Sequence, residues 1–357
     1  MKARIVIGAN YGDEGKGTVV ARYAKESKNV LNVLTNGGSQ RAHSILTPDG
    51  NITYRHFGSG TYYGADNYYS RYFILNPVQF VKEYNELIIK PCTIYRDRRC
   101  FWTTIYDMLA NYIAEQQKHR HASCCMGIWN TIRRTREKGY LSFDNFMHFN
   151  DIQQILYLTQ IREYYENEMI IPSEFIDIWK DPGLIKHFLD DCKYFYKHTV
   201  TEELKNLQPL YDNIIFENGQ GLLLSDKGYD TYDTTPSDTG IKYSLELLSD
   251  LDNIESITAH YVTRPYLTRH GDGSLTNEKN KKLIAQDIQD DRTNRYNDFQ
   301  GDFRYGAIDL LDLKKRVTDD AKTIDFEIEL THCDEMDSVD EFKKHFNKVN
   351  TYDTPLI

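Results

Sequence analysis

The segment of this sequence whose residue types point most clearly to a chemical function is a glycine-rich loop at residues 8–17, Gly-Ala-Asn-Tyr-Gly-Asp-Glu-Gly-Lys-Gly. A short β-branched run precedes it at residues 5–7, and a helix-compatible stretch follows at residues 19–28. This is the order of a phosphate cradle, because backbone N–H groups, a helix N-terminus and a lysine ammonium converge on phosphate oxygens. The loop therefore predicts phosphate binding through Lys16 and its neighbouring glycines.

The loop differs from the standard P-loop pattern, G-x-x-x-x-G-K-[ST], at two positions. Asn10 stands in place of the first glycine, and Gly17 stands in place of the hydroxyl residue that binds magnesium. The loop also contains an acid, Asp13, which a plain ATPase does not need. These differences argue against a simple ATPase.

A second polar glycine loop follows the next apolar run. Residues 30–34 have the composition of a buried strand, and the loop at residues 35–44 comes directly after them. Two strand exits this close in sequence are expected at the same edge of a parallel sheet, where such folds bind ligands. Asp13 and His43 could then share one γ-phosphate, although each taken alone is more often ordinary loop chemistry.

Three further segments could bind parts of a nucleotide. The Ser-Cys-Cys-Met-Gly stretch at residues 123–127, followed by three arginines, could hold a monophosphate, or the arginines could lie on a solvated helix face. Gln220 could pair with a purine edge or simply form a turn. The sequence Thr-His-Cys-Asp at residues 331–334 follows an apolar run, and its aspartate could accept N–H groups of guanine, although such a motif is also common without a ligand.

The overall composition favours a metabolite as the partner. The 357 residues carry a net charge of −10, which argues against a nucleic acid polymer. There is no long apolar span or signal-like N-terminus, so we expect no membrane association and a cytoplasmic location. The six cysteines form no C-x-x-C pair and are expected to be reduced thiols.

The remaining pattern is that of an α/β protein with a P-loop-like, mainly parallel central sheet flanked by helices. Helical patterns dominate residues 103–206, and no linker or repeat divides the chain. We therefore predict a single domain over residues 1–357 with a mostly helical insertion at residues 103–206. The other expected elements are a hairpin of residues 44–46 and 52–56, strands at 72–75, 212–216, 257–262 and 323–330, helices at 77–87 and 308–317, and a glycine loop at 217–221.

Taken together and in order, these motifs resemble the adenylosuccinate synthetase family over most of the chain. The specific part is Gly-Asp-Glu-Gly-Lys-Gly at residues 12–17, which is much narrower than a generic P-loop. Weaker similarities follow in the family's order at residues 37–44, 123–128, 217–221, 261–264, 300–306 and 330–334. The resemblance implies the family's fold and its reaction. In that reaction an NTP phosphorylates O6 of a 6-oxopurine nucleotide, and L-aspartate then displaces the phosphate to give an N-succinyl purine.

The resemblance also implies roles for individual residues. Asp13 would remove the N1 proton, His43 would stabilise the transferring phosphoryl group, and Mg²⁺ would be held by Asp13 and the carbonyl of Ala42. The implied NTP-binding residues are Gly12, Glu14, Gly15, Lys16, Gly17, Thr18, Thr331 and Asp334. The acceptor nucleotide would be bound by Asp13, Asn36, Gln40, Ser123, Cys124, Arg136, Gln220 and Thr235, and the aspartate by Gln300, Gly301 and Arg304. Arg136 would act from the partner subunit, which implies a homodimer.

Differences from the family pattern bear on the substrates. Gln-Arg-Ala-His-Ser at residues 40–44 replaces the usual Asn-Ala-Gly-His-Thr, and His332 replaces a lysine whose stem covers the guanine of GTP. Asp302 is the counterpart of an arginine that contacts the ribose 2′-hydroxyl. A compact chain with these changes resembles the phage branch of the family, the 2-aminoadenylosuccinate synthetases. That branch implies dGMP as acceptor, ATP or dATP as donor, and a role in diaminopurine DNA synthesis in the host cytoplasm.

Three alternatives stay open at this point. The chain could be an ordinary adenylosuccinate synthetase that uses IMP and GTP. It could be a non-catalytic nucleotide-binding protein, in view of the altered second loop, although the presence of Asp13, Lys16 and His43 argues against this. It could also be a kinase that stops at the phosphorylated nucleotide.

Overall fold

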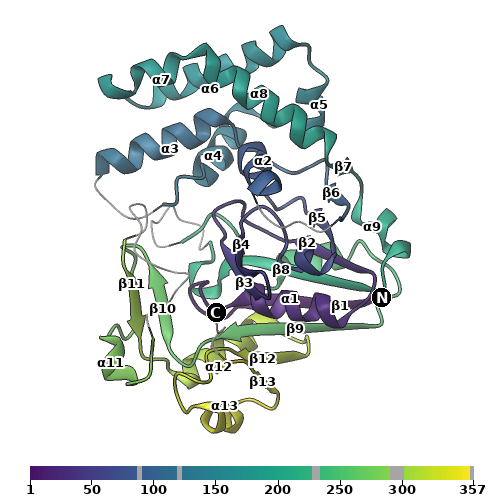
Figure 1. The fold of residues 1–357 in the computed structure, drawn as a ribbon, viewed down its shortest axis with the longest axis vertical. Coiled ribbons are helices and arrows are strands. Elements are labelled where there is room, and N and C mark those ends of the chain that lie inside the picture. The colour runs from purple at the N-terminus through teal and green to yellow at the C-terminus, as the bar shows by residue number, and fades with distance from the viewer. Residues whose placement is uncertain (87–90, 119–122, 227–233, 290–300, 354–357) are drawn as a thin grey trace.

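The centre of the molecule is a parallel sheet. The structure is a computed structural model, and it describes residues 1–86, 91–118, 123–226, 234–289 and 301–353. Within these residues, nine strands pair in parallel in the order β13-β12-β9-β1-β8-β2-β5-β6-β7 (Figure 1). Their bounds are β1 Lys2–Gly8, β2 Val30–Leu34, β5 Asp66–Tyr69, β6 Ile94–Arg96, β7 Val200–Thr201, β8 Asn213–Gly221, β9 Ser256–Thr263, β12 Phe326–Leu330 and β13 Val349–Thr351. The predicted α/β class with a mainly parallel sheet is confirmed.

The central strands are apolar on both faces because helices cover both sides of the sheet. Val6 of β1 packs with Val19 and Val20 on one face. Ile5 and Ile7 of the same strand belong to a second cluster on the opposite face. That second cluster also contains residues of helices α10 (Lys242–Leu248) and α12 (Leu310–Ala321). A near-continuous apolar run is what a parallel strand buried on both faces requires.

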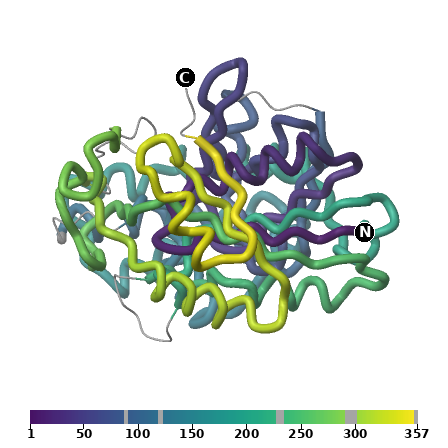
Figure 2. The backbone as a smooth tube through the Cα atoms, turned by 90° about the horizontal axis from the view of Figure 1, so that it is seen from below, coloured from purple at the N-terminus to yellow at the C-terminus, as the bar shows by residue number. Residues whose placement is uncertain are grey.

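Helix α1 (Lys16–Glu26) leaves the sheet directly after the first glycine loop. The helix begins at Lys16, three residues before the predicted start, because Gly15 adopts a left-handed conformation with φ of 95° and ends the loop abruptly. Near the end of the described chain, the centroid of the Tyr352 ring lies 4.9 Å from the Arg22 guanidinium of α1. The C-terminal segment, yellow in Figure 2, therefore packs beside the N-terminal helix.

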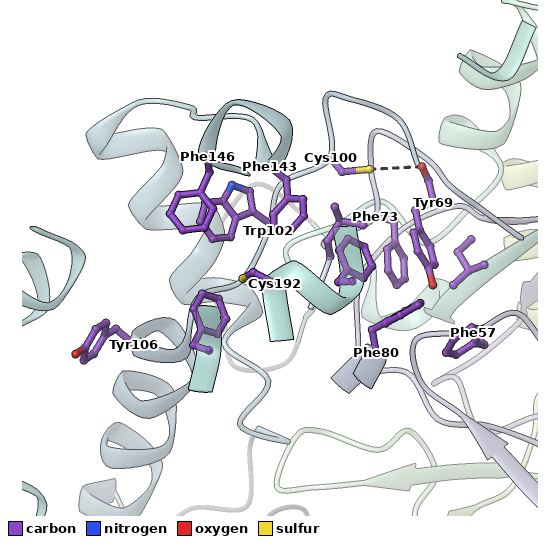
Figure 3. Close-up of a cluster of buried hydrophobic side chains, with 14 of the residues drawn as sticks. Phe57, Tyr69, Phe73, Phe80, Cys100, Trp102, Tyr106, Phe143, Phe146 and Cys192 are labelled. Atoms are coloured by element: carbon purple, nitrogen blue, oxygen red, sulfur yellow. Dashed lines mark hydrogen bonds between the residues drawn. The ribbon is translucent and has the colours of Figure 1, made fainter. Parts of the chain in front are cut away.

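Most of the remaining helices lie in the region predicted to be helical, at the top of Figure 1. Their centre is an aromatic core in which the Trp102 and Phe146 ring centroids are 4.6 Å apart (Figure 3). That these helices form an insertion into a single domain stays a prediction. The helix bounds are α2 Pro77–Glu86, α3 Ile105–Lys118, α4 Ile128–Lys138, α5 Phe143–Met147, α6 Asp151–Glu168, α7 Ile176–Lys180, α8 Pro182–Lys197, α9 Leu204–Leu207, α11 Lys281–Ile284 and α13 Val339–His345.

Two antiparallel ribbons complete the described part of the chain. Strands β3 (His43–Thr47) and β4 (Gly50–Tyr54) form the predicted hairpin, with a shorter turn than expected. Strands β10 (Leu267–His270) and β11 (Phe303–Gly306) form the second ribbon. No helix in the described residues is both long and apolar enough to span a bilayer.

Two sequence predictions about strands and loops are wrong. Residues 72–75 form no strand, since the chain turns where the Phe73 N–H donates to the Ser70 carbonyl, and the strand at that place in the sheet is β5. The expected glycine loop at residues 217–221 is the second half of β8. Because β8 lies between β1 and β2, its backbone finds partners on both sides, and this outweighs the weak strand propensity of its glycines.

Candidate active site

A cavity of about 200 Å³ lies where the central parallel strands end, and both predicted loops line it. Nine of the predicted site residues meet there: Gly12, Asp13, Gln40, Ala42, His43, Ser123, Cys124, Gln220 and Thr235. Other lining residues are Tyr11, Arg41, Arg55, Asn111, Met126, Ile128, Trp129, Leu224, Thr234, Pro236, Arg269 and His270. Asp13 and His43, which the sequence predicts to act together, therefore line one cavity.

The first loop is held together by its own charged side chains. Lys16 Nζ donates to the Gly12 carbonyl at 2.7 Å and lies 3.8 Å from a Glu14 carboxylate oxygen. The other Glu14 oxygen accepts from the backbone N–H groups of Gly12 and Asn10 at 2.8 and 3.2 Å. Burial raises the pKa of Glu14 and lowers that of Lys16. The Lys16 side chain is 0% exposed, so its ammonium must turn away from Gly12 to reach a phosphate.

Neighbouring strands and helices hold the loop from outside. Arg264, which follows β9, donates to the Asp13 carbonyl at 2.8 Å. Arg316 of α12 donates to the Asn10 side-chain oxygen at 2.7 Å. Thr331 donates from its hydroxyl to the Glu14 carbonyl at 2.7 Å. Asn10 thus has a structural reason to replace the glycine of a standard P-loop, and Thr331 lies against the loop that the sequence predicts it to serve.

Gly17 explains how the second loop comes so close to the first. A Cβ atom at this position would lie 2.6 Å from the Ser44 carbonyl oxygen. The first turn of α1 therefore packs directly on β3, the strand that begins with His43. A serine or threonine at position 17 would push these two elements apart.

His43 is fixed by a buried carboxylate that sequence reasoning missed. Its Nδ1 lies 2.6 Å from an oxygen of Glu217 on β8, and Glu217 is 0% exposed. Ser59 donates to the same carboxylate from its backbone N–H at 2.9 Å and from its hydroxyl at 2.7 Å. Because the carboxylate occupies Nδ1, Nε2 is the ring nitrogen of His43 that is left for a ligand. The only available signal in the sequence was an acid following the apolar run at residues 212–216.

Arg41 is a second buried charge beside His43. Its Nη2 lies 2.6 Å from the same Glu217 oxygen, and its side chain is 0% exposed. Burial and the Arg41 charge lower the pKa of His43 to about 3, so His43 is neutral at rest. Burial alone would raise the pKa of Glu217, but the Arg41 charge and the His43 hydrogen bond outweigh it and hold that pKa below its usual range.

The opposite wall of the cavity is a chain of amide and hydroxyl groups. Gln40 donates to the Thr235 hydroxyl at 3.0 Å, and Asn36 donates to the Ser237 hydroxyl at 3.1 Å. The Gly219 N–H donates to the Asn36 side-chain oxygen at 2.9 Å, which ties this wall to β8. The predicted acceptor residues Gln40 and Thr235 thus lie together in the cavity lining, whereas Asn36 is buried and does not line the cavity.

The third part of the site is the loop that leads into α4. Asn111 of α3 accepts from the Ser123 hydroxyl and from the Gly127 N–H, both at 3.1 Å. Arg134 on α4 is buried in an ion pair with Asp107 at 2.8 Å. Arg136, the predicted phosphate ligand, is exposed on the same helix and does not line the cavity.

The predicted aspartate-binding residues are not gathered into this cavity. Gln300 lies outside the described residues, and Gly301 and Arg304 do not line the cavity. Arg304 pairs instead with Glu278 at 2.8 Å. Asp334 is exposed and also lies away from the cavity lining.

The donor set at the cavity suits a magnesium ion. Asp13 has a carboxylate and the exposed residue Ala42 a backbone carbonyl, and both residues line the cavity together with His43. Oxygen ligands of these two kinds are what Mg²⁺ prefers, with water and phosphate oxygens completing its shell.

Sequence comparison places the chain among known proteins. The sequence model of the family described as "Adenylosuccinate synthetase" matches residues 5–346, which is nearly the whole chain. The chain belongs to the adenylosuccinate synthetase family. This is a family of NTP-dependent ligases that form a carbon–nitrogen bond.

Individual relatives are distant. An adenylosuccinate synthetase of Coxiella burnetii is 24% identical over 360 residues, covering 95% of this chain and 77% of the relative. One of Dehalococcoides mccartyi is 29% identical over 122 residues, which cover 33% of this chain and 28% of the relative. The matched segment thus spans under a third of the Dehalococcoides protein.

Two solved structures share the fold. The fully ligated adenylosuccinate synthetase of Plasmodium falciparum has a TM-score of 0.69 and 19% identity, covering 94% of this chain and 77% of that one. The cyanophage S-2L succinoaminodeoxyadenylate synthetase (PurZ), bound to dGMP and dATP as an energy donor, has a TM-score of 0.65 and 11% identity. It covers 99% of this chain and 91% of that one. At these identities the likeness concerns the fold.

Proposed function

We propose that this chain is a ligase that joins L-aspartate to C6 of dGMP through a 6-phosphoryl intermediate, with ATP or dATP as the phosphoryl donor. The product would be 2-amino-2′-deoxyadenylosuccinate, a precursor of diaminopurine for phage DNA. The observation that carries the proposal is that Asp13 and His43, which follow different strands, line one cavity beside the Lys16 loop. A simple ATPase has no use for this pair of groups.

The first chemical step uses Asp13 as a base. Its carboxylate would take the proton from N1 of the purine, which makes O6 nucleophilic toward the γ-phosphorus. Lys16 would turn from the Gly12 carbonyl to a phosphate oxygen and neutralise part of the developing charge. Asp13 and the Ala42 carbonyl would hold Mg²⁺, which supplies charge neutralisation at the phosphates.

His43 would act on the transferring phosphoryl group and on its departure. With Nδ1 hydrogen-bonded to Glu217, Nε2 is the nitrogen that can meet a phosphoryl oxygen. An anionic phosphoryl group beside Nε2 raises the proton affinity of the ring, so the bound complex favours a proton at that nitrogen. His43 then donates to the oxygen that leaves when the aspartate amine attacks C6.

The choice of dGMP has specific support. The S-2L structure holds dGMP and dATP, and its fold covers nearly all of both chains. In this chain, an aspartate at position 302 and a histidine at position 332 replace residues that would favour a ribonucleotide and GTP. A second candidate is the ordinary reaction with IMP and GTP. The names of the sequence relatives and the slightly higher TM-score of the Plasmodium structure favour it.

We also propose a homodimer. Arg136 lies outside its own subunit's cavity, so a role at a phosphate requires a second copy of the chain. All the substrates are small metabolites, and we place the reaction in the cytoplasm, that of the host if the chain is phage-encoded. Sedimentation of the pure protein tests the dimer directly.

A substrate cross-assay decides between these candidates. Phosphate release is measured with dGMP, GMP and IMP, each combined with ATP, dATP and GTP, in the presence and absence of L-aspartate. We expect the highest kcat/KM with dGMP and an adenine donor, strictly dependent on aspartate. A clear preference for IMP with GTP would establish the ordinary reaction, and ADP formation without aspartate would indicate a kinase.

Two variants test the assigned chemistry. Asp13→Asn and His43→Ala are expected to lower kcat by about 10²- to 10⁴-fold, the usual worth of a general acid or base. Binding of dGMP, followed by calorimetry, is expected to persist in both. Near-normal turnover in both variants would refute the roles, and absence of turnover in every substrate combination would favour a non-catalytic nucleotide-binding protein.

A further inference from the structure

Arg55 is a cation of the cavity that no motif accounts for. It follows β4 directly and lines the same cavity as Asp13 and Ser123. Its backbone N–H donates to Glu83 of α2 at 2.8 Å. The next two backbone N–H groups donate to the same buried carboxylate, at 3.0 and 3.2 Å. The backbone that carries Arg55 is therefore firmly anchored.

The other arginines that line the cavity are already engaged. Arg41 is paired with Glu217. Arg269 donates to the Ser274 carbonyl at 2.7 Å and lies 5.1 Å from the centroid of the Tyr11 ring. In the part of the chain that the structure describes, the Arg55 guanidinium has no hydrogen bond or ion pair within the protein, and it is only partly exposed. Of these cations it is the one available to a ligand.

Arg55 lines the same cavity as the loop that leads into α4. The cavity wall at this end also contains Asn111, Ser123 and Cys124. Burial raises the pKa of the Cys124 thiol, and the Arg55 charge opposes this shift. Hydroxyl, amide and guanidinium groups in this arrangement suit a phosphate, because arginine binds phosphate through two parallel N–H bonds.

The arginines of α4 do not supply this charge within the subunit. Arg134 forms a buried ion pair with Asp107, and the Arg133 guanidinium lies 3.6 Å from a carboxylate oxygen of Glu168. Arg136 is exposed outside the cavity. Among the described arginines that line the cavity, Arg55 is therefore the one left to bind an anion beside Ser123.

We propose that Arg55 binds the 5′-monophosphate of the acceptor nucleotide from within its own subunit. This inference rests on the proposed function, because it names a residue for the acceptor of that reaction. It extends the assignment made from sequence, in which the only cation at the monophosphate is Arg136 of a second copy.

The β3–β4 hairpin gives the proposal a geometric consequence. His43 pairs with Tyr54 across the hairpin, so Arg55 is one residue beyond the partner of His43. The hairpin and the residue directly after it thus carry the imidazole for the phosphoryl group and the guanidinium for the monophosphate. In this proposal, the groups that bind the two ends of the acceptor come from neighbouring positions of one subunit.

The test compares Arg55→Ala and Arg55→Lys with a matched control, Arg98→Ala, which removes an exposed arginine that does not line the cavity. We expect Arg55→Ala to raise KM for the acceptor by roughly 10- to 100-fold, the worth of a hydrogen bond to a charged group, with kcat nearly unchanged. Arg55→Lys keeps the charge but loses the two-point contact, so its KM is expected to lie between the KM of the parent protein and that of Arg55→Ala. Arg98→Ala is expected to match the parent protein.

A binding measurement separates this proposal from the proposed function. Calorimetry with dGMP, IMP and deoxyguanosine is expected to show that Arg55→Ala loses most of the preference for a monophosphate over the nucleoside, whichever base is preferred. If no substrate pair turns over, the proposed ligase fails while this binding result still decides the role of Arg55. Unchanged monophosphate binding in a folded Arg55→Ala protein, or a loss seen only in Arg136→Ala, would overturn the inference.

Discussion

Replacing Glu217 by glutamine tests two roles of this residue: its contribution to the stability of the fold and its orientation of His43 for the reaction. Glu217 accepts from His43 Nδ1 at 2.6 Å and from the Ser59 hydroxyl at 2.7 Å, and it faces Arg41 at 2.6 Å. The amide keeps the shape of the side chain but removes its charge. It leaves the Arg41 guanidinium buried without an anionic partner.

The magnitude follows from the burial of this pair. Removing one partner of a fully buried ion pair costs about 3–5 kcal/mol in free energy of unfolding. With an unfolding entropy of about 2.1 cal/mol/K per residue, a chain of this length should lose roughly 4–7 °C in Tm. His43 also loses the anion that holds its ring, so kcat should fall by up to about 10²- to 10⁴-fold.

A double variant resolves the two effects. In Arg41→Met/Glu217→Gln the uncompensated charge is gone, so the free energy of unfolding in urea should return most of the way to that of the parent. The phosphate-release rate should stay low, because His43 still lacks its carboxylate. Arg41→Met alone serves as the reference, since it leaves Glu217 bound to His43 and Ser59.

Two outcomes would refute this reasoning. If the destabilisations of the single variants simply add in the double variant, then Arg41 and Glu217 are not coupled, in spite of their 2.6 Å separation. If Glu217→Gln retains the parent kcat, then the His43 orientation does not depend on the carboxylate.

Two further predictions concern acid stability and helix packing. Because the folded pKa of His43 is lowered to about 3 from 6.5, the neutral ring stabilises the fold above pH 6.5, and this contribution is lost as the pH falls toward 3. Between pH 6 and pH 5 the free energy of unfolding in urea should fall by about 1.4 kcal/mol per pH unit more in the parent protein than in His43→Asn. Equal pH dependence of the two proteins would contradict the lowered pKa of His43. Gly17→Ala should lower the free energy of unfolding by about 1–3 kcal/mol, because its Cβ would meet the Ser44 carbonyl at 2.6 Å. A thermal melt equal to that of the parent would show that α1 does not pack on β3 so closely.

The position of Asp13 and His43 in one cavity was predictable from the sequence. Asp13, Lys16 and His43 come within two short segments, and parallel strands bring such loops to one edge regardless of the details of packing. The strand at residues 30–34 was predicted with its observed bounds because four of its five residues are apolar, and all five are buried.

The partners of these residues were not predictable in the same way. Glu217 lies 174 positions from His43, and its role depends on β8 lying between β1 and β2 in the sheet. Periodicity in one sequence gives no information on strand order. Arg316, which holds Asn10 from 306 positions away, was missed for the same reason.

The lack of a hydroxyl residue at position 17 and the presence of Asp13 in the first loop have a common explanation. A standard P-loop places a hydroxyl residue after the lysine, but here that position must let β3 approach to 2.6 Å of where a Cβ would lie. The approach brings the His43 end of β3 beside the Lys16 loop, which a phosphoryl transfer to a second nucleotide requires. The oxygen ligands for the proposed metal then have to come from elsewhere, and the proposed donors, Asp13 and the Ala42 carbonyl, belong to residues that line the cavity. Restoring the P-loop hydroxyl with Gly17→Ser should therefore not create an ATPase, because the added side chain displaces His43 from the site.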